Sequence, residues 1–400
     1  MSLQLSNGGS DVVAISANGP FVFPTALASG AAYSVTVAVQ PGGQTCVVTN
    51  GAGVVAASNV AAISVNCEQA EFALVPNRAD GTTSVYRIDP SSGALGQVPG
   101  SPFPTGSQPT DITVTGNVAY IAQPGSNTVQ GFSINATTGA LTPIDGGVAA
   151  GLSPESIVSD PSGKFVYVAN AGSDTVTSFS IDPTSHALSA VDTEPAGSQP
   201  VALAVSLTGP SLYVADESSG FDFSFTTNTA TGALTTALGT PFFECFQPFA
   251  IAVAPSGQYV YTVCNGGNDI SMQNANPSTG QLGVSTTLAG VGASSITITP
   301  SGKFAYMGKI GSNTIQIYNV GATDGLFDPT TVQSVQISPG SEAVHVTVDP
   351  TGRWLYAPTA AGTVAAFTID ATSGALTAVP GNQAPAGNSP TTLAIARPVP

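Results

Sequence analysis

The pattern of apolar and polar positions is clearest over residues 163–182, and copies of this stretch recur along the chain. Phe165 and Tyr167 alternate with Val166 and Val168 in the period of two that is typical of a β-strand. A turn cluster, Gly172-Ser-Asp174, separates this run from a second alternating run that ends at Asp182. One copy therefore predicts a β-hairpin.

The copies follow one another at a steady interval. The residues equivalent to Tyr167 are Leu74, Tyr120, Tyr213, Tyr261, Tyr306 and Tyr356. With Tyr167 in its place, the steps from Leu74 to Tyr356 are 46, 47, 46, 48, 45 and 50 residues. Tight turns such as 160–163 precede the anchor, and an apolar run such as 202–205 precedes the turn. A period of this length marks a repeat architecture with four strands per unit.

Seven four-stranded units with no helical period predict an all-β fold, a seven-bladed β-propeller over residues 69–400. A β-solenoid repeats at shorter intervals, and sandwich domains need units of about 100 residues. The first unit lacks a first strand, whereas residues 391–396 resemble a first strand with no unit after it. We expect 391–396 to pair antiparallel with 71–75 and close the ring, which leaves no free sheet edge.

Residues 1–68 lie outside the repeat and predict a small β-sandwich. Short apolar runs at 12–16, 20–23, 33–39, 46–49 and 61–65 are separated by Asn-Gly, Ser-Gly and Gly-Gly turns. Cys46 and Cys67 are expected to form a disulfide, worth about 3 kcal/mol in the chain-entropy model. The segment from Phe23 to Cys46 resembles the immunoglobulin-like modules that precede propellers in bacterial cell-surface proteins.

Composition narrows the classes of function. Only 8% of the residues are charged, against about 25% in ordinary soluble domains, which suits an extracellular β protein. A net charge of −16 with seven Lys and Arg excludes a nucleic-acid footprint and argues against binding to anionic membranes. No apolar run reaches the ~18 residues of a membrane span, and Met1-Ser-Leu3 does not begin a signal peptide. We expect an exported monomer in its mature form, without a cofactor or metal.

The repeat also resembles a known family. The run Lys164-Phe-Val-Tyr-Val-Ala-Asn170, with Asp182-Pro-Thr-Ser185 and their copies, is similar to the Tyr-Val-Thr-Asn repeat of lactonase-like seven-bladed propellers, which include 6-phosphogluconolactonase. The resemblance covers residues 69–400. Enzymes of that group use Arg, His and Glu in a central funnel to hold anionic lactones, but no catalytic residue can be transferred to this sequence.

The repeat register places two sets of residues at one end of the ring, the usual ligand face of a propeller. The loops before the first strands bring Gln108, Gln199 and Gln247, and the ends of the second strands bring Asn170, Asp216 and Lys309. This neutral, polar face suits hydrogen bonding to a sugar or a peptide. The alternative is that these side chains cap strand ends and bind water.

One loop departs from the repeat. Residues 240–249 carry four Phe, and the preceding unit supplies Asp216, Glu217 and Asp222. We predict a binding spot that includes Glu217, with the alternative that the aromatic rings cover the end of the blade. Cys245 and Cys264 come to the same end of a hairpin and predict a second disulfide, which would place the protein in an oxidising compartment. The aromatic candidates are Phe242, Phe243 and Phe246.

Most ionisable residues have a structural interpretation. Asp89, Asp182 and Asp370 share a position before a turn, and His186 replaces a turn glycine. His345 lies in a first strand near Glu342, and this pair is the candidate for acid–base catalysis. No Ser/His/Asp spacing, phosphate loop or zinc pattern is present.

Three functions follow. The preferred one is an exported, non-enzymatic propeller that binds a protein partner or an extracellular glycan on its neutral face. The first alternative is a lactonase-like hydrolase that uses His345 and Glu342, with Asp216 and Lys309 as helpers. The second alternative is an architectural surface or adhesion protein.

Overall fold

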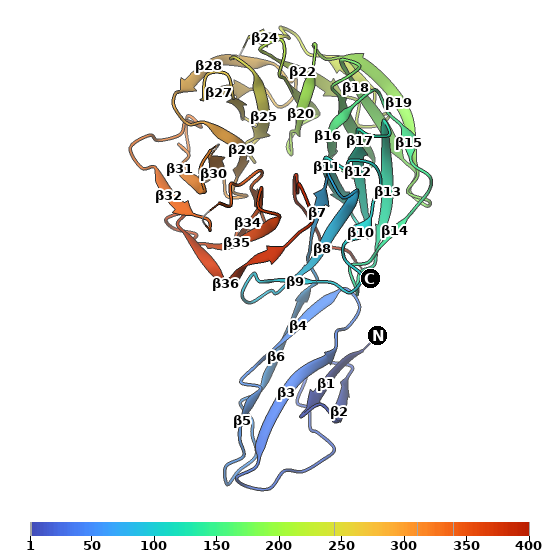
Figure 1. The fold of residues 1–400 in the computed structure, drawn as a ribbon, viewed down its shortest axis with the longest axis vertical. Coiled ribbons are helices and arrows are strands. Elements are labelled where there is room, and N and C mark those ends of the chain that lie inside the picture. The colour runs from blue at the N-terminus through green and yellow to red at the C-terminus, as the bar shows by residue number, and fades with distance from the viewer. Residues whose placement is uncertain (1, 244, 310, 339, 400) are drawn as a thin grey trace.

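The computed structural model describes residues 2–243, 245–309, 311–338 and 340–399. Every regular element there is a β-strand. Figure 1 shows a ring of sheets with a smaller module projecting from one side of it. In the described part of the chain, seven sheets of four or five strands make the ring, and a four-stranded sheet and a two-stranded ladder make the module.

The ring is built from seven blades that repeat one strand order. We number the blades by their second strands, which follow the chain. The first strand of each blade lines the axis, and these strands are β37 (Ala394–Ala396), β11 (Asp111–Thr115), β16 (Pro154–Ser159), β20 (Pro200–Val205), β25 (Pro248–Val253), β29 (Ala293–Ile298) and β33 (Thr347–Val348). The second strands are β7 (Phe72–Asn77), β12 (Val118–Gln123), β17 (Phe165–Asn170), β21 (Ser211–Asp216), β26 (Tyr259–Cys264), β30 (Phe304–Lys309) and β34 (Trp354–Thr359).

The third and fourth strands form the outside of the ring. The third strands are β8 (Thr82–Ile88), β13 (Thr128–Ile134), β18 (Thr175–Ile181), β22 (Phe221–Thr227), β27 (Asp269–Ala275), β31 (Thr314–Asn319) and β35 (Thr363–Ile369). The outer strands are β9 (Leu95–Gln97) and β10 (Phe103–Pro104), β14 (Leu141–Pro143) and β15 (Val148–Ala149), β19 (Leu188–Pro195), β23 (Leu234–Thr236) and β24 (Phe242–Phe243), β28 (Leu282–Leu288), β32 (Gln333–Gln336) and β36 (Leu376–Pro385). Each outer strand pairs with the third strand of its blade.

The last strand of the chain completes the first blade. Strand β37 pairs antiparallel with β7, in the register Ala394 to Leu74, Ile395 to Ala73 and Ala396 to Phe72. The Thr347 hydroxyl of β33 donates to the Leu393 carbonyl at 3.0 Å, which joins blade 7 to blade 1. Blade 1 therefore contains both ends of the propeller segment.

Tyrosines at the repeat anchor join neighbouring blades. Their rings are buried, and four of their hydroxyls donate to the backbone carbonyl of a turn in the next blade at 2.8–3.0 Å. A buried hydroxyl needs a hydrogen-bond partner, and here the neighbouring blade provides it. The four pairs are Tyr120 with His186, Tyr261 with Gly325, Tyr306 with Gly374 and Tyr356 with Gly93.

The N-terminal module has its own small core. Leu5, Val35 and Cys46 are buried between the sheet β2-β1-β3-β5 and the ladder β4-β6. Cys46 and Cys67 lie opposite each other in that ladder and form the expected disulfide. The prediction of a strand at residues 20–23 is wrong, since this segment is irregular. The strands are β1 (Leu3–Asn7), β2 (Asp11–Ile15), β3 (Ala32–Val39), β4 (Gln44–Thr49), β5 (Ala52–Val54) and β6 (Ser64–Gln69).

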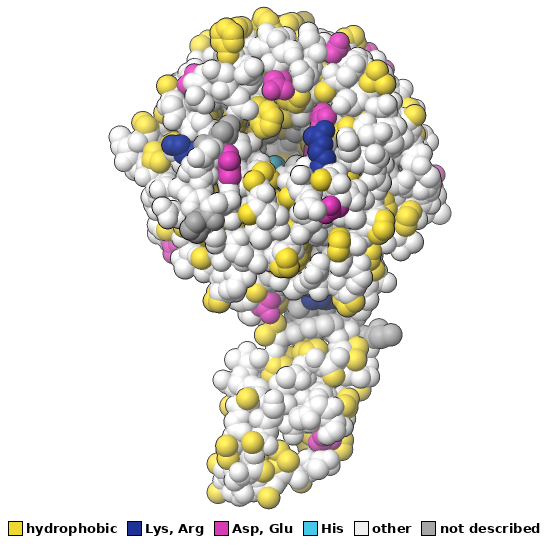
Figure 2. All heavy atoms as spheres, in the orientation of Figure 1, with side chains coloured by type: hydrophobic (Ala, Val, Ile, Leu, Met, Phe, Trp, Pro, Cys, Tyr) yellow, Lys and Arg dark blue, Asp and Glu magenta, His cyan; other side chains and the backbone are white. Residues whose placement is uncertain are grey.

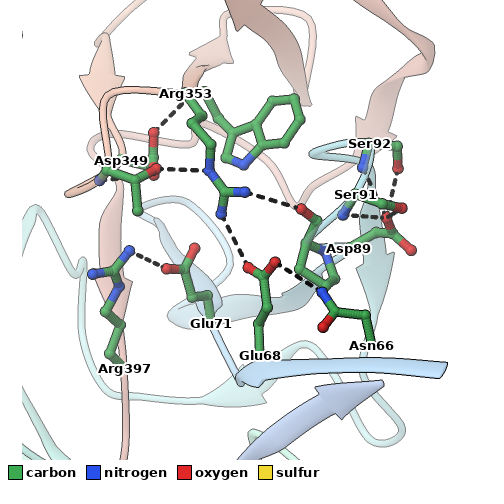
Figure 3. Close-up of polar contacts among 12 residues, drawn as sticks. Asn66, Glu68, Glu71, Asp89, Ser91, Ser92, Asp349, Arg353 and Arg397 are labelled. Atoms are coloured by element: carbon green, nitrogen blue, oxygen red, sulfur yellow. Dashed lines mark hydrogen bonds and ion pairs between the residues drawn. The ribbon is translucent and has the colours of Figure 1, made fainter. Parts of the chain in front are cut away.

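Polar contacts join the module to the propeller at a neck (Figure 3). The Arg353 guanidinium lies 3.3 Å from the Glu68 carboxylate of β6, and Arg397 pairs with Glu71. Arg87 of β8 also donates to the Thr45 hydroxyl at 2.7 Å. The neck therefore uses three of the four arginines of the chain, which leaves Arg78 for the other face of the ring.

Candidate functional site

A cavity of about 800 Å³ occupies the centre of the ring. It opens at the end where the first strands begin, and we call that side of the ring the top face. Figure 2 shows the hollow, with a His side chain inside it and acidic and basic side chains at its edge. Its volume is within the ~300–1,000 Å³ range of small-molecule sites.

Two tiers of side chains line this cavity, and in four blades a β-bulge in the first strand accounts for them. In blades 3 to 6 the pairing with the second strand skips one residue, so two consecutive side chains face the axis instead of one. The skipped residues belong to the upper tier, which is Thr110, Glu155, Val201, Phe249, Ser294, Val344 and Thr391. The lower tier, one residue further along each strand, is Asp111, Ser156, Ala202, Ala250, Ser295, His345 and Thr392.

Four adjacent blades give the lower tier a polar arc. Blades 7, 1, 2 and 3 are neighbours in the ring and contribute His345, just before β33, Thr392, just before β37, Asp111 of β11 and Ser156 of β16, and Ser295 of the adjoining blade 6 extends the arc. The Asp111 carboxylate accepts hydrogen bonds from the Ser156 hydroxyl at 3.0 Å and from the Ile157 amide at 2.9 Å. These bonds come from the adjacent blade and hold Asp111 in place at the cavity wall.

The two ionisable groups of the polar arc are both shifted towards the neutral form. Burial raises the pKa of Asp111, and the hydrogen bonds from the Ile157 and Ile112 amides and from Ser156 oppose that rise. Burial also lowers the pKa of His345 to about 4. His345 is therefore a neutral imidazole at pH 7, and the Asp111 carboxylate is more basic than an exposed one.

A charged pair stands at the edge of the cavity. Arg78, directly after β7, lies 3.5 Å from the Glu155 carboxylate, which also accepts a hydrogen bond from Ser153 at 3.2 Å. Further round the edge, Gln199 donates to Glu217 at 3.4 Å. Among the described residues that line the cavity, Arg78 is the one cation and faces three carboxylates, Asp111, Glu155 and Glu217.

Blades 4 and 5 give the opposite wall an apolar arc. Val201 and Ala202 of β20 and Phe249 and Ala250 of β25 occupy both tiers there. Behind them Leu203 and Ile251 also contact the cavity. The cavity is therefore polar on one side and apolar on the other.

The structure brings three of the sequence-predicted site residues to the cavity, Gln199, Glu217 and His345. Glu342 instead accepts a hydrogen bond from the Gly311 amide at 2.7 Å and does not line the cavity. In the described part of the chain no hydrogen bond joins Glu342 to His345. The pairing of these two residues is therefore corrected, and Asp111 is the carboxylate that shares the lower tier with His345.

Asn170 and Asp216 brace loops rather than face a ligand. Both side chains are fully buried at the ends of their second strands. The Asn170 side chain accepts from the Gly151 amide at 3.0 Å, and Asp216 accepts from the Gln199 amide at 3.0 Å. These bonds hold the loops before the first strands, and neither residue is among those that line the cavity.

The remaining candidates of the top face lie outside the cavity. Gln108 and Gln247 are exposed and have positive φ angles of 55° and 57°, so their position reflects a turn in the backbone. Lys309 is partly buried at the end of β30 and does not line the cavity.

The aromatic loop carries the expected disulfide, but its aromatic side chains do not form one cluster. Cys245 and Cys264 form the second disulfide. Phe242 is partly buried in β24, Phe243 stacks edge-on against Phe221 and is 66% exposed, and Phe246 is exposed as well. Phe249, which the sequence did not single out, is the aromatic residue that lines the cavity.

Arg78 and Asp111 were missed because the comparison of the repeats stopped at the loop before each first strand and at the last residue of each second strand. Glu155 was missed because alternation assigns one residue in two to each face of a strand. The bulge breaks that alternation, and Glu155 is itself a bulged residue. A better signal was available in the repeat, since Asp111, Ser156 and His345 stand at one aligned position. Comparison of the side chains at that position would have identified the polar arc.

The described residues hold neither a metal-binding cluster nor a membrane-spanning helix. No cluster of three or more His, Cys, Asp or Glu there is arranged to hold a metal ion. Within the same residues, no helix has the length and apolar character to cross a bilayer.

Comparison with known families identifies the propeller. The family described as lactonase, 7-bladed beta-propeller, matches residues 43–154, 151–245 and 248–395. The chain belongs to this lactonase family. The match covers all seven blades of the ring and agrees with the repeat read from the sequence.

Solved structures share the fold of this lactonase-family chain at low sequence identity. A putative 6-phosphogluconolactonase from Bacteroides fragilis is 19% identical, with a TM-score of 0.69 over 82% of this chain and 98% of the other. A periplasmic gluconolactonase from Pseudomonas aeruginosa is 16% identical, with a TM-score of 0.68 over 82% and 99%. A search of curated proteins found no match.

Family membership corrects the preferred function. A non-enzymatic propeller that binds a glycan or a partner was expected because the top face looked neutral and lacked arginine. The match to the lactonase family contradicts that expectation and favours the hydrolase alternative. The physical error was to judge the site from its loops, whereas the ionisable side chains lie deeper, on the first strands.

Proposed function

We propose that the protein hydrolyses a lactone in the central cavity of its propeller. The observation that carries this proposal is the polar arc, where a partly buried carboxylate and a neutral imidazole share one tier of a cavity in a lactonase-family ring. Paired titratable groups with shifted pKa values in a concave site are typical of acid–base catalysis.

Asp111 is the general base in this proposal. The carboxylate takes a proton from a water molecule, whose oxygen attacks the lactone carbonyl carbon. The bond from that carbon to the ring oxygen then breaks, and the proton returns from Asp111 to the ring oxygen, which leaves a hydroxy acid. Burial raises the pKa of Asp111 and so makes its carboxylate a stronger base than an exposed aspartate.

His345 serves as a neutral hydrogen-bond donor. With a pKa lowered to about 4, its imidazole carries no charge at pH 7 and is a weak base. In this proposal its N–H donates to the carbonyl oxygen, which gains negative charge during the attack. Ser156 positions Asp111 through the 3.0 Å hydrogen bond.

The test measures the hydrolysis of a panel of lactones, with pH-stat titration of the acid that each reaction releases. We expect Asp111→Asn to lower kcat by at least about 100-fold and His345→Ala to lower kcat by about 10²–10³-fold, the usual range for a general base and an oxyanion donor. The control is Glu194→Gln on the outer strand β19, which removes one carboxylate far from the cavity and keeps the wild-type rate. Absence of turnover for every lactone would reject the proposal.

We further propose that the protein functions in an oxidising compartment, the periplasm or the cell exterior. The two disulfides support this location, because such bonds persist where thiols are not kept reduced. We also propose that residues 1–68 are an immunoglobulin-like spacer. The small core between two sheets and the Cys46–Cys67 bond support it.

A further inference from the structure

We propose that the substrate is an uncharged lactone with an apolar substituent, whose ring faces the polar arc and whose substituent lies on the apolar arc. This inference rests on the proposed function and adds the substrate class. It follows from the unequal walls of the cavity and from their charge.

The apolar arc is continuous over two blades and both tiers. Val201 and Ala202 stand beside Phe249 and Ala250, and β20 and β25 are adjacent in the ring. Phe249 lines the cavity and is 39% exposed, so part of its side chain is available to a ligand. An aliphatic or acyl chain would cover this surface and remove it from water.

A polyhydroxylated ring fits this cavity poorly. A sugar lactone carries a hydroxyl on most of its carbons, so whichever edge faces Val201 and Phe249 places hydroxyls against apolar side chains. A buried hydroxyl without a partner is costly, and the side chains of the two tiers in blades 4 and 5 offer it no acceptor. The polar side chains of the two tiers are instead grouped on the other five blades, where an ester group finds donors and acceptors.

The charge of the cavity excludes an anionic substituent. Three carboxylates line it, and Arg78, the one cation among the described lining residues, is already paired with Glu155. A phosphorylated lactone would meet a negative potential without a free cation. The same potential favours release of the product, since opening the ring produces a carboxylate.

The orientation follows from these two walls. Asp111 and His345 hold the carbonyl end on the side of blades 7 to 3, and the substituent crosses the axis to blades 4 and 5. Phe249 stands in the upper tier and meets the far end of the substituent. It is therefore a specificity residue that does not touch the reacting atoms.

The experiment compares wild type with Phe249→Ser and with Phe243→Ser as the matched control. Phe243 belongs to the same loop region and is exposed, but it does not line the cavity. The probes are γ-butyrolactone, γ-lactones with alkyl chains of two to six carbons, glucono-δ-lactone and 6-phosphogluconolactone. Binding of the matching γ-lactams, which resist hydrolysis, is measured by calorimetry.

For wild type we expect kcat/KM to rise about threefold to fourfold for each added methylene, as for burial of apolar surface. Phe249→Ser should raise KM for the alkyl lactones at least about tenfold, with little change for γ-butyrolactone, and Phe243→Ser should change neither. Turnover that does not depend on the chain, or that is fastest with glucono-δ-lactone or its phosphorylated form, would overturn the inference and leave the hydrolase proposal intact.

The lactams separate the two proposals. Alkyl lactams that bind tightly while no lactone is hydrolysed would support the binding site and reject the hydrolase. Failure of both the alkyl lactams and the alkyl lactones would overturn the inference.

Discussion

At the scale of single residues, one aligned position holds different chemistry in each blade. The lower tier carries Asp111, Ser156 and His345 among small residues, although the backbone around them repeats. The repeat therefore supplies the geometry, and a few substitutions supply the reactive groups. Burial in the shared funnel then shifts their pKa values, an effect that no single blade would produce by itself.

The protonation of His345 should be visible in stability. Its pKa is lowered to about 4 in the folded protein, so between pH 6.5 and 4 the unfolded chain binds a proton that the folded chain does not. The free energy of unfolding should fall by up to about 3 kcal/mol as the pH drops through this range, at 1.36 kcal/mol per pKa unit.

The measurement is urea denaturation of wild type and His345→Gln at pH 4, 5, 6 and 7. The difference between the two proteins removes the contribution of the carboxylates, including that of Asp111, which has the opposite sign. Parallel pH profiles for the two proteins would contradict the assigned burial of His345.

At the scale of elements, the turn between the third and fourth strands shows how neighbouring blades constrain each other. Its glycine has a positive φ and abuts the first residue of the previous blade's second strand, as Gly374 abuts Phe304. His186 occupies the same turn position with φ 59°, and the residue at the matching strand position is Val118. A smaller neighbour there leaves room for a side chain.

Gly374→Ala should therefore destabilise the protein by about 2–4 kcal/mol, the sum of left-handed strain and overpacking. The added Cβ would lie 2.5 Å from the Phe304 ring. The matched control is Gly280→Ala, which has the same turn and a φ of 69° but no atom nearer than 3.4 Å. Thermal unfolding should show a loss of stability of about 1 kcal/mol for Gly280→Ala. An equal loss of stability in both variants would refute the packing argument.

At the scale of the whole molecule, ring closure and the neck use the same segment of chain. Strand β37 completes blade 1, and Arg397, directly after it, pairs with Glu71 where the module joins the propeller (Figure 3). The Glu71 side chain is 10% exposed. Burial raises its pKa, and the charge of Arg397 opposes that rise.

Arg397→Met should cost about 1–3 kcal/mol at pH 7, because it leaves a largely buried carboxylate unpaired. Because the pKa of Glu71 is raised in the folded protein, the free energy of unfolding falls as the pH rises above about 4.5. Removal of the Arg397 charge raises this pKa further, so in the variant the free energy of unfolding continues to fall at higher pH. Its loss should therefore shrink near pH 4, where Glu71 is protonated.

Circular dichroism in urea at pH 4 and pH 7 measures this effect. Arg353→Met is the control, since its partner Glu68 is 39% exposed and a surface pair contributes at most about 1 kcal/mol. A loss for Arg397→Met that is the same at both pH values would contradict the proposed role.

The sequence by itself determined the repeat, the class of fold and the strands of the propeller. These are local properties, since alternation, turn residues and a period of about 46 residues are visible without any neighbour in space. Both disulfides were also predicted, Cys46–Cys67 from the even cysteine count in a small module and Cys245–Cys264 from the register of one hairpin.

Only the tertiary structure decided the site. The bulges appear only in the pairing of the strands, and the presence of Asp111 and His345 in one cavity depends on the closure of the ring. Burial, charge and pKa at the funnel belong to seven blades together, so a reading of each repeat in turn could name His345 but not its partner. The physical reason is that strand pairing is local, whereas the solvation of a side chain depends on everything packed around it.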